Sequence, residues 1–145
     1  MKKCSEVMTS KPVCCGPDDV VARAAKLMKV GNIGSIPVVE NDQNRKLVGI
    51  VTDRDLALHI VAEGRDAKST KVKAVMTADV VTCLADDDLQ KALEAMATHQ
   101  LRRIPIVDSA NTLVGIIAQA DVATRVDQPE KTAEMVKEIS KANGK

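Results

Sequence analysis

The sequence predicts a mixed α+β fold made of two tandem copies of one repeat, each running strand, helix, strand, strand, helix. Three apolar motifs carry this prediction, because each occurs twice and both sets follow the same order. They are Val7-Met8-Thr9 and Val75-Met76-Thr77, Ile36-Pro37-Val38-Val39 and Ile104-Pro105-Ile106-Val107, and Gly49-Ile50-Val51-Thr52 and Gly115-Ile116-Ile117-Ala118. The spacing between the copies changes only in one polar turn, between Asp108 and Leu113, as expected of an internal repeat.

Length and composition indicate one compact body with an aliphatic core. The chain has 145 residues, of which 45% are hydrophobic and 28% are charged. A copy of about 60 residues is marginal alone, so we expect the two copies to share a core. Phe, Tyr and Trp are absent and the net charge is +1. Nucleic-acid binding is therefore not expected, because no ring can stack on a base and no overall positive charge attracts phosphate.

The sequence has no feature of a membrane or secreted protein. No apolar run approaches the roughly 20 residues that cross a bilayer, and Met1-Lys2-Lys3-Cys4 does not lead into the apolar segment of a signal peptide. We therefore expect a cytoplasmic protein without membrane contacts. Its 4 cysteines are then expected to be reduced thiols.

Turn-forming residues divide the first copy into elements. Strands are expected over residues 12–15, 35–40 and 47–51 and a helix over residues 54–63. Another helix is expected to be capped by Asp18 and stopped by Gly31-Asn32, and its apolar positions, Met28 among them, recur at helical spacing. Asn and Asp residues mark 41–44 as a turn. The polar stretch 63–73 is interpreted as a linker.

The second copy repeats this order and is followed by a tail. Strands are expected over 80–83, 103–107 and 113–117, helices over 87–99 and 119–126, and a turn over 108–112. We expect the first repeat to span residues 1–66, the second 67–126 and a helical tail 127–145. The thin apolar stripe of the tail must pack on its own body or on a second copy of the chain.

The duplicated motifs are a strand with proline near its start and a strand ending in Gly-apolar-apolar-Thr-x-x-Asp. They resemble the CBS domain, named for cystathionine beta-synthase. A tandem pair of such domains is similar to a Bateman module, and the resemblance covers about residues 5–126. It implies two repeats packed sheet to sheet around a pseudo-twofold axis, with two clefts that commonly hold adenosine nucleotides. The family is regulatory rather than catalytic.

The chemistry of an adenosine nucleotide matches residues of one such cleft. Asp55 offers a carboxylate to the ribose hydroxyls, and Thr52 offers a hydroxyl at a helix N-terminus, where anions are favoured. In the family pattern the phosphate is contacted by residues just before the proline strand of the other repeat, here Arg102 and Arg103. The resemblance implies a main cleft lined by Ile50, Thr52, Arg54, Asp55, Val80, Val81, Thr82, Arg102 and Arg103.

The second cleft is expected to be weak or empty. By pseudo-symmetry it would use Val13, Gly34, Ser35 and Asp121. Asp121 keeps the ribose acceptor, but Ala118 has no hydroxyl, and Gly34-Ser35 supplies no cation for a phosphate.

Simpler interpretations of the main cleft stay open. Thr52 and Asp55 also match a capping box, which would employ both side chains without a ligand. Arg102 and Arg103 could be a solvated pair, and adjacent side chains at a strand start point in opposite directions, so that only one would face the cleft. The recurrence of Asp121 beside Ala118, where no cap hydroxyl remains, favours ligand contact by Asp55.

Neither a metal site nor a catalytic site is indicated. Cys4, Cys14, Cys15 and Cys83 form no C-x-x-C pair, and the 2 histidines lie on predicted helices. Small buried hydrophobic side chains are the simpler interpretation of the cysteines. Because no nucleophile elbow or Walker loop is present, we expect no enzyme activity and no required cofactor.

Two functional hypotheses follow. The first is a ligand-sensing module that binds AMP, ADP, ATP or a related adenosyl compound and signals to a separate effector protein or through its homodimer. The second is a ligand-free scaffold that uses the paired fold for dimerisation and partner binding. The weak second cleft is the best support for the scaffold.

Overall fold

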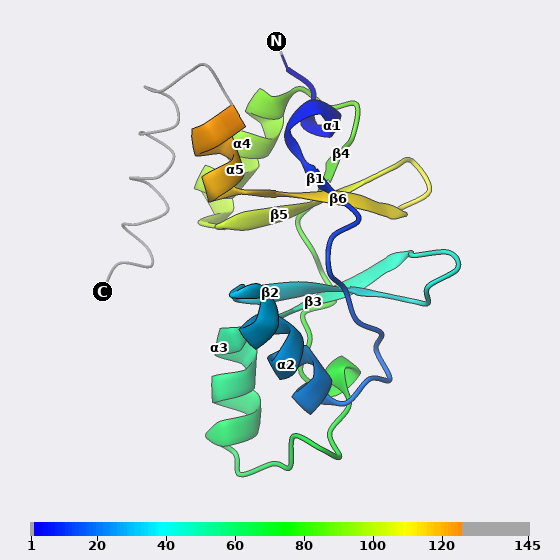
Figure 1. Cartoon of the computed structure of the whole chain (residues 1–145), viewed down its shortest axis with the longest axis vertical. Coiled ribbons are helices and arrows are strands. Elements are labelled where there is room, and N and C mark those ends of the chain that lie inside the picture. Colours follow the sequence, from blue (N-terminus) through cyan, green and yellow to red (C-terminus); the bar gives the residue numbers. More distant parts are fainter. Residues whose placement is uncertain (1, 126–145) are drawn as a thin grey trace. The chain divides into compact units, whose positions relative to one another are not determined.

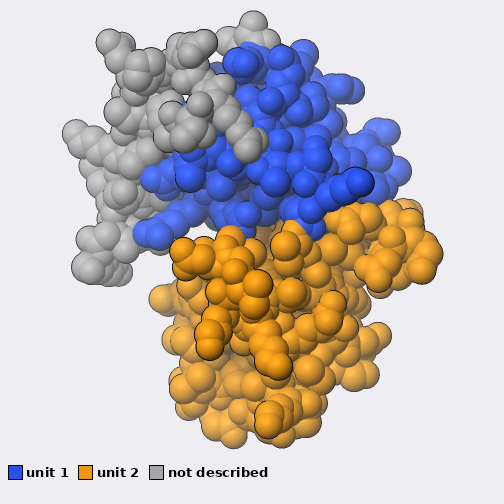
Figure 2. Space-filling view, viewed as in Figure 1, with its two compact units in different colours: residues 1–12, 81–145 blue, residues 13–80 orange. Residues whose placement is uncertain are grey.

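The computed structural model describes residues 2–125, which fall into two compact units (Figure 2). Unit 1 contains residues 1–12 together with residues 81–145, and unit 2 contains residues 13–80. The expected helical tail, residues 127–145, lies outside the described residues. The beginning of the chain therefore belongs to the same unit as the second half of the sequence.

Unit 2 is built on an antiparallel strand pair, β2 (Ser35–Val39) and β3 (Leu47–Thr52). Its helical segments are α2 (Val21–Gly31), α3 (Asp53–Leu56), the π-helical turn η1 (Ala57–Val61) and the 3₁₀ turn η2 (Val72–Ala74). Figure 1 shows α2 and α3 together beside this strand pair. The predicted turn is confirmed, since Asn41 Oδ1 accepts the backbone N–H groups of Gln43 and Asn44.

Unit 1 contains a four-stranded sheet in the order β1-β6-β5-β4. Its strands are β1 (Thr9–Ser10), β4 (Cys83–Leu84), β5 (Arg103–Val107) and β6 (Leu113–Ala118). Its helices are α1 (Cys4–Val7), α4 (Leu89–His99) and α5 (Gln119–Arg125). Strand β4 is parallel to β5, whereas β5 and β6 form an antiparallel hairpin like β2 and β3 (Figure 1). The predicted mixed α+β class is confirmed, and helix, strand, strand, helix recurs in both units.

Both long helices end in the same way. The residue after α2 is Asn32 (φ 52°) and the residue after α4 is Gln100 (φ 56°), and each adopts the left-handed conformation that closes a helix C-terminus. The predicted stop at Gly31-Asn32 is therefore confirmed. Asn32 takes the positive φ, because Gly31 is still the last helical residue.

The start of α2 differs from the prediction. Its N-cap is Val20 rather than Asp18, and no side chain caps it. Asp18 instead forms ion pairs with Lys73 (3.1 Å) and Lys71 (3.5 Å). Asp19 closes the preceding turn, since its Oδ2 accepts the N–H of Gly16 at 2.8 Å. Asp18 and Asp19 are thus engaged in ion pairs and in a turn hydrogen bond, and neither side chain caps the helix.

The first strand of each repeat is shorter than predicted. Within 12–15, only Cys15 pairs with a strand, through one bridge to Val38, and Pro17, which has no N–H, follows closely. In place of the expected strand 80–83, β4 begins at Cys83. Of the residues in these two segments, only Cys15 and Cys83 pair with a strand, and both are buried.

The stretch 63–73 is packed rather than a free linker. The N–H of Val21 donates to the Thr70 carbonyl (2.8 Å) and that of Ala22 to the Ala67 carbonyl (2.9 Å). Val72 is fully buried in the core of unit 2. The backbone carbonyls of this segment accept hydrogen bonds from the first N–H groups of α2. Its polar composition alone does not predict this role.

The leading motif of each repeat pairs with the last strand of the other repeat. Thr9 lies opposite Ile116 in the β1–β6 pair, and Thr77 lies opposite Ile50 in a bridge to β3. The two backbone hydrogen bonds between Ile50 and Thr77 are each 2.9 Å long. Because each leading motif pairs with the other repeat's last strand, residues 1–12 belong to unit 1 and residues up to 80 belong to unit 2.

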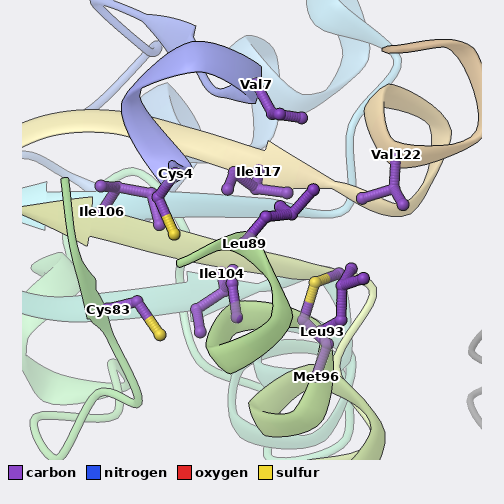
Figure 3. Packing of buried hydrophobic residues seen from close by; sticks show 11 residues of the cluster. Cys4, Val7, Cys83, Leu89, Leu93, Met96, Ile104, Ile106, Ile117 and Val122 are labelled. Atoms are coloured by element: carbon purple, nitrogen blue, oxygen red, sulfur yellow. The ribbon is translucent and has the colours of Figure 1, made fainter. Parts of the chain in front are cut away.

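Each unit has its own core cluster, whereas we expected the two copies to share one core. Both clusters are aliphatic, as the absence of aromatic residues requires. In unit 1, Met96 and Ile104 are fully buried between α4 and β5, and Val7 of α1 and Val122 of α5 join the same cluster (Figure 3). Met28 occupies the matching position in the core of unit 2. The apolar position predicted for Met28 is confirmed, and Met96 is its counterpart in unit 1.

Candidate functional site: the two strand-to-helix junctions

The junction of unit 2, where β3 passes into α3, contains a complete capping box. The Asp55 N–H donates to Thr52 Oγ1 (3.1 Å), and the Thr52 N–H donates to Asp55 Oδ2 (2.9 Å). The capping alternative is thus confirmed for both residues. Both side chains are half-buried, and the mutual hydrogen bonds hold the Asp55 carboxylate in one orientation.

Gly34 and Ser35 lie against this same junction. Ser35 is opposite Thr52 in the β2–β3 ladder, and the Asp53 N–H donates to the Gly34 carbonyl at 2.8 Å. An ideal Cβ at Gly34 would be only 2.9 Å from Asp53 Oδ2. A side chain at Gly34 would therefore require the exposed Asp53 carboxylate to move.

The junction of unit 1, where β6 passes into α5, repeats half of the capping box. The Ala118 N–H donates to Asp121 Oδ2 at 3.0 Å, as the Thr52 N–H does to Asp55 Oδ2. Ala118 has no hydroxyl that could accept the N–H of Asp121 in turn. Arg103 lies opposite Ala118 in the β5–β6 ladder, and the Gln119 N–H donates to the Arg102 carbonyl at 2.8 Å. Two arginines thus stand where unit 2 has Gly34 and Ser35.

The Asp121 carboxylate partly offsets the cost of burying the Arg103 guanidinium. Partial burial of the Arg103 guanidinium lowers its pKa, and the nearby Asp121 carboxylate acts in the opposite direction by favouring the charged form. Arg102 is exposed, whereas Arg103 is half-buried. The expected opposite directions of these adjacent side chains agree with this difference.

The predicted site residues are distributed over both units. Those in unit 2 are Val13, Gly34, Ser35, Ile50, Thr52, Arg54, Asp55 and Val80, and those in unit 1 are Val81, Thr82, Arg102, Arg103 and Asp121. Within a unit, the structure brings Gly34 and Ser35 to Thr52, and Arg102 and Arg103 to Ala118. Both expected clefts combine residues of different units, so their composition stays a prediction.

Three contacts at the junctions were not predicted from the sequence. Asp53 contacts Gly34, Gln119 bonds to Arg102, and Arg103 lies near Asp121. The register of the β2–β3 and β5–β6 hairpins is the signal from which these contacts could have been predicted. In each hairpin the residues before the proline strand face the end of the strand that closes the repeat.

The cysteines behave mainly as buried apolar residues. Cys4, Cys15 and Cys83 are buried, and Cys14 is half-buried. Burial raises the pKa of the Cys4 and Cys15 thiols to about 12 and also raises that of Cys83, with smaller contributions from Asp87 near Cys4 and Cys83 and from Asp19 near Cys15. Over residues 2–125 the structure holds no group of three or more His, Cys, Asp or Glu side chains suited to a metal ion.

A search of the described residues finds no helix with the length and apolar character needed to cross a membrane.

Comparison with known proteins gives a consistent picture. A family model described as CBS domain matches residues 4–62 and 72–127. The chain is 40% identical over 143 residues to the CBS domain-containing protein YhcV of Bacillus subtilis, spanning 99% of each protein.

Solved structures show the same fold. Hypoxic response protein I, solved with two coordinated zinc ions, has a TM-score of 0.76 and 29% identity, covering 86% of this chain and 99% of that one. The CBS domain pair of protein MJ0100, in complex with 5′-methylthioadenosine and S-adenosyl-L-methionine, has a TM-score of 0.73 and 25% identity, covering 86% and 94%. The repeated motifs of the sequence are thus found in proteins of one architecture.

Proposed function

This chain belongs to the CBS domain family and carries a regulatory CBS domain pair, and on that premise we propose that it senses an adenosine nucleotide. The ligand is AMP, ADP, ATP or a related adenosyl compound, bound between the repeats. Binding shifts the module toward one of two arrangements, because a ligand stabilises the state for which it has the higher affinity.

The oriented carboxylate of Asp55 is the observation that carries the proposal. Its Oδ2 atom accepts the Thr52 N–H, but an ionised carboxylate offers about four acceptor positions. Capping and ribose binding are therefore compatible, and the capping box holds the carboxylate ready for a cis-diol. Asp121, held by Ala118 in the same way, repeats this feature in unit 1.

Two further observations support an adenosine ligand with phosphate. The related CBS domain pair of MJ0100 was solved with two adenosine-containing compounds, which supports the adenosine part. Arg102 and Arg103 supply guanidinium groups, which match phosphate oxygens in shape and charge. No step of this proposal needs a metal ion or a cofactor.

Thermal unfolding with a panel of ligands tests the proposal. The chain has no Trp or Tyr, so unfolding is followed by circular dichroism with AMP, ADP, ATP, 5′-methylthioadenosine and S-adenosyl-L-methionine. A ligand present at a hundred times its Kd stabilises the folded state by about 2.7 kcal/mol. We expect a clear rise in Tm with at least one compound.

Two variants test whether the ligand-dependent rise in Tm requires Asp55. Asp55→Ala should abolish the ligand-dependent rise in Tm, whereas Asp42→Ala, in the exposed 41–44 turn, should leave it intact. An unchanged ligand response in Asp55→Ala would remove Asp55 from the site. No response to any compound in the wild-type protein would favour the ligand-free scaffold instead.

We propose that the signal passes through a homodimer or to a separate effector protein. Light scattering at several protein concentrations, with and without the ligand, measures whether a dimer forms. A monomer at every concentration would leave only the separate effector.

A further inference from the structure

Arg103 and Asp121 are both anchored to Ala118 in unit 1. Arg103 is its partner across the β5–β6 ladder, and the Asp121 carboxylate accepts its backbone N–H at 3.0 Å. The hairpin register and the first turn of α5 therefore bring the two charged residues to one end of the strand pair. This placement follows from the backbone and does not depend on a ligand.

The half-buried position of Arg103 gives the Asp121 carboxylate an electrostatic role. A guanidinium that loses part of its water needs a compensating negative charge. Asp121 provides one, since its carboxylate favours the charged form of Arg103. The Asp121 carboxylate thus partly offsets the cost of burying the Arg103 guanidinium.

The corresponding position in unit 2 has no such pair. There the partner of Thr52 across the ladder is Ser35, and Asp55 takes the place of Asp121. Asp55 is oriented by the capping box and faces no arginine on the neighbouring strand position. The two junctions are therefore alike in backbone and different in charge.

We infer that Asp121 competes with the phosphate of a ligand for Arg103 and so sets the affinity of the module for anionic ligands. This inference rests on the proposed function and specifies how the phosphate is recognised. A phosphate that binds Arg103 must displace the Asp121 carboxylate. The free-energy cost of this displacement reduces the net affinity for the phosphate. A ligand without phosphate meets no such competition. Asp121 is a specificity-determining residue, although it contributes no positive charge.

Asp121→Asn is the variant that isolates this role. The Asn side-chain carbonyl can still accept the Ala118 N–H, so the start of α5 is kept while the negative charge is removed. Isothermal titration calorimetry then gives the Kd of AMP and of 5′-methylthioadenosine, an adenosine compound without phosphate. We expect Asp121→Asn to raise the affinity for AMP about tenfold relative to that for 5′-methylthioadenosine, since loss of a ribose contact would weaken both ligands alike. An unchanged or lower ratio of the two affinities would overturn the inference.

A double-mutant cycle shows that the effect acts through Arg103. In an Arg103→Gln background, Asp121→Asn should leave the ratio of the affinities for AMP and 5′-methylthioadenosine unchanged, because the cation for which the two anions compete is gone. A persisting tenfold gain would mean that removing Asp121 attracts phosphate by some other route. Asp55→Asn is the matched control in unit 2, and it should weaken both ligands together.

Inorganic pyrophosphate separates failure of this inference from failure of the proposed function. If no variant binds any adenosine compound, the proposed function is wrong, but the competition can still be measured with pyrophosphate alone. Pyrophosphate should raise the Tm of Asp121→Asn more than that of the wild type, and this difference should vanish when Arg103→Gln is added. Equal shifts in wild type and Asp121→Asn, including no shift in either, would overturn the inference.

Discussion

The sulfur of Met76 lies where a side chain at Gly49 would begin. An ideal Cβ at Gly49 would be 2.6 Å from Met76 Sδ and 3.0 Å from the Thr77 carbonyl oxygen. Met8 stands in the same relation to Gly115 in unit 1. The methionine of each leading motif therefore covers the glycine of the other repeat's last strand, and this contact ties sequence-distant segments together.

Gly49→Ala should destabilise the protein. The added methyl group collides with Met76 and approaches the Thr77 backbone, and overpacking of this kind costs about 1–3 kcal/mol. Urea unfolding followed by circular dichroism measures the loss. Gly16→Ala is the control, because its Cβ would meet neighbours only at 3.7 Å or more. If Gly49→Ala were as stable as Gly16→Ala, the packing of Met76 on this strand would be wrong.

Removing or completing the capping box should change stability in opposite directions. Thr52→Ala deletes the hydroxyl that accepts the Asp55 N–H and should cost about 1 kcal/mol. Ala118→Thr offers that hydroxyl to the N–H of Asp121 and should stabilise unit 1 by roughly 0.5 kcal/mol. Thr77→Ala, at an exposed position, is the control for loss of a threonine hydroxyl. A loss in Thr52→Ala no greater than this control would contradict the capping role.

Val72→Ala tests whether the 63–73 stretch is part of the folded unit. Val72 is fully buried, whereas Val30 is 88% exposed. Truncating the buried side chain should cost about 2 kcal/mol, because two methyl groups leave the core. The same truncation at Val30 should change the free energy of unfolding by less than about 0.5 kcal/mol. Similar values for the two variants would show that the stretch is a loose linker after all.

Stability should fall at alkaline pH because of the buried thiols. The pKa of Cys4 is raised to about 12, whereas a thiol in the unfolded chain ionises near pH 9. Between these values only the unfolded state loses the proton, so the contribution of the thiol is complete below about pH 9 and declines as pH rises toward 12. The loss is about 1.4 kcal/mol per pH unit for each such thiol.

Urea unfolding at pH 8 and pH 10 measures this effect. Cys4→Ala should show a smaller loss of stability between the two pH values than the wild type. Val7→Ala, at a fully buried neighbour in the same core, should lose stability equally at both. Parallel pH dependence in wild type and Cys4→Ala would show that the thiol is not shielded from solvent.

Local patterns were the most predictable part of the fold. The strand expected over 103–107 is β5 itself, and the C-terminal end of α2 and the Asn41 turn also follow from nearby residues. Segments whose partners lie far away in the sequence were predicted less well. Pairing of Cys15 is confined to one bridge, and the 63–73 stretch is packed because α2 needs hydrogen-bond acceptors at its start.

The candidate site shows the same division. Thr52 and Asp55 could be recognised from the sequence, because a capping box is a local pattern of residues three apart. The electrostatic influence of Asp121 on Arg103 could not, because it depends on hairpin register and on the first turn of the next helix.

The sequence by itself determined the two repeats, the mixed α+β class, the family and the position of each strand-to-helix junction. These depend on periodicity and short motifs, which act over a few residues. Only the tertiary structure decided that the leading motif of each repeat packs on the other repeat's last strand. It also decided that the two junctions differ in charge. Both results arise from contacts between distant residues, which a repeated pattern permits in more than one arrangement.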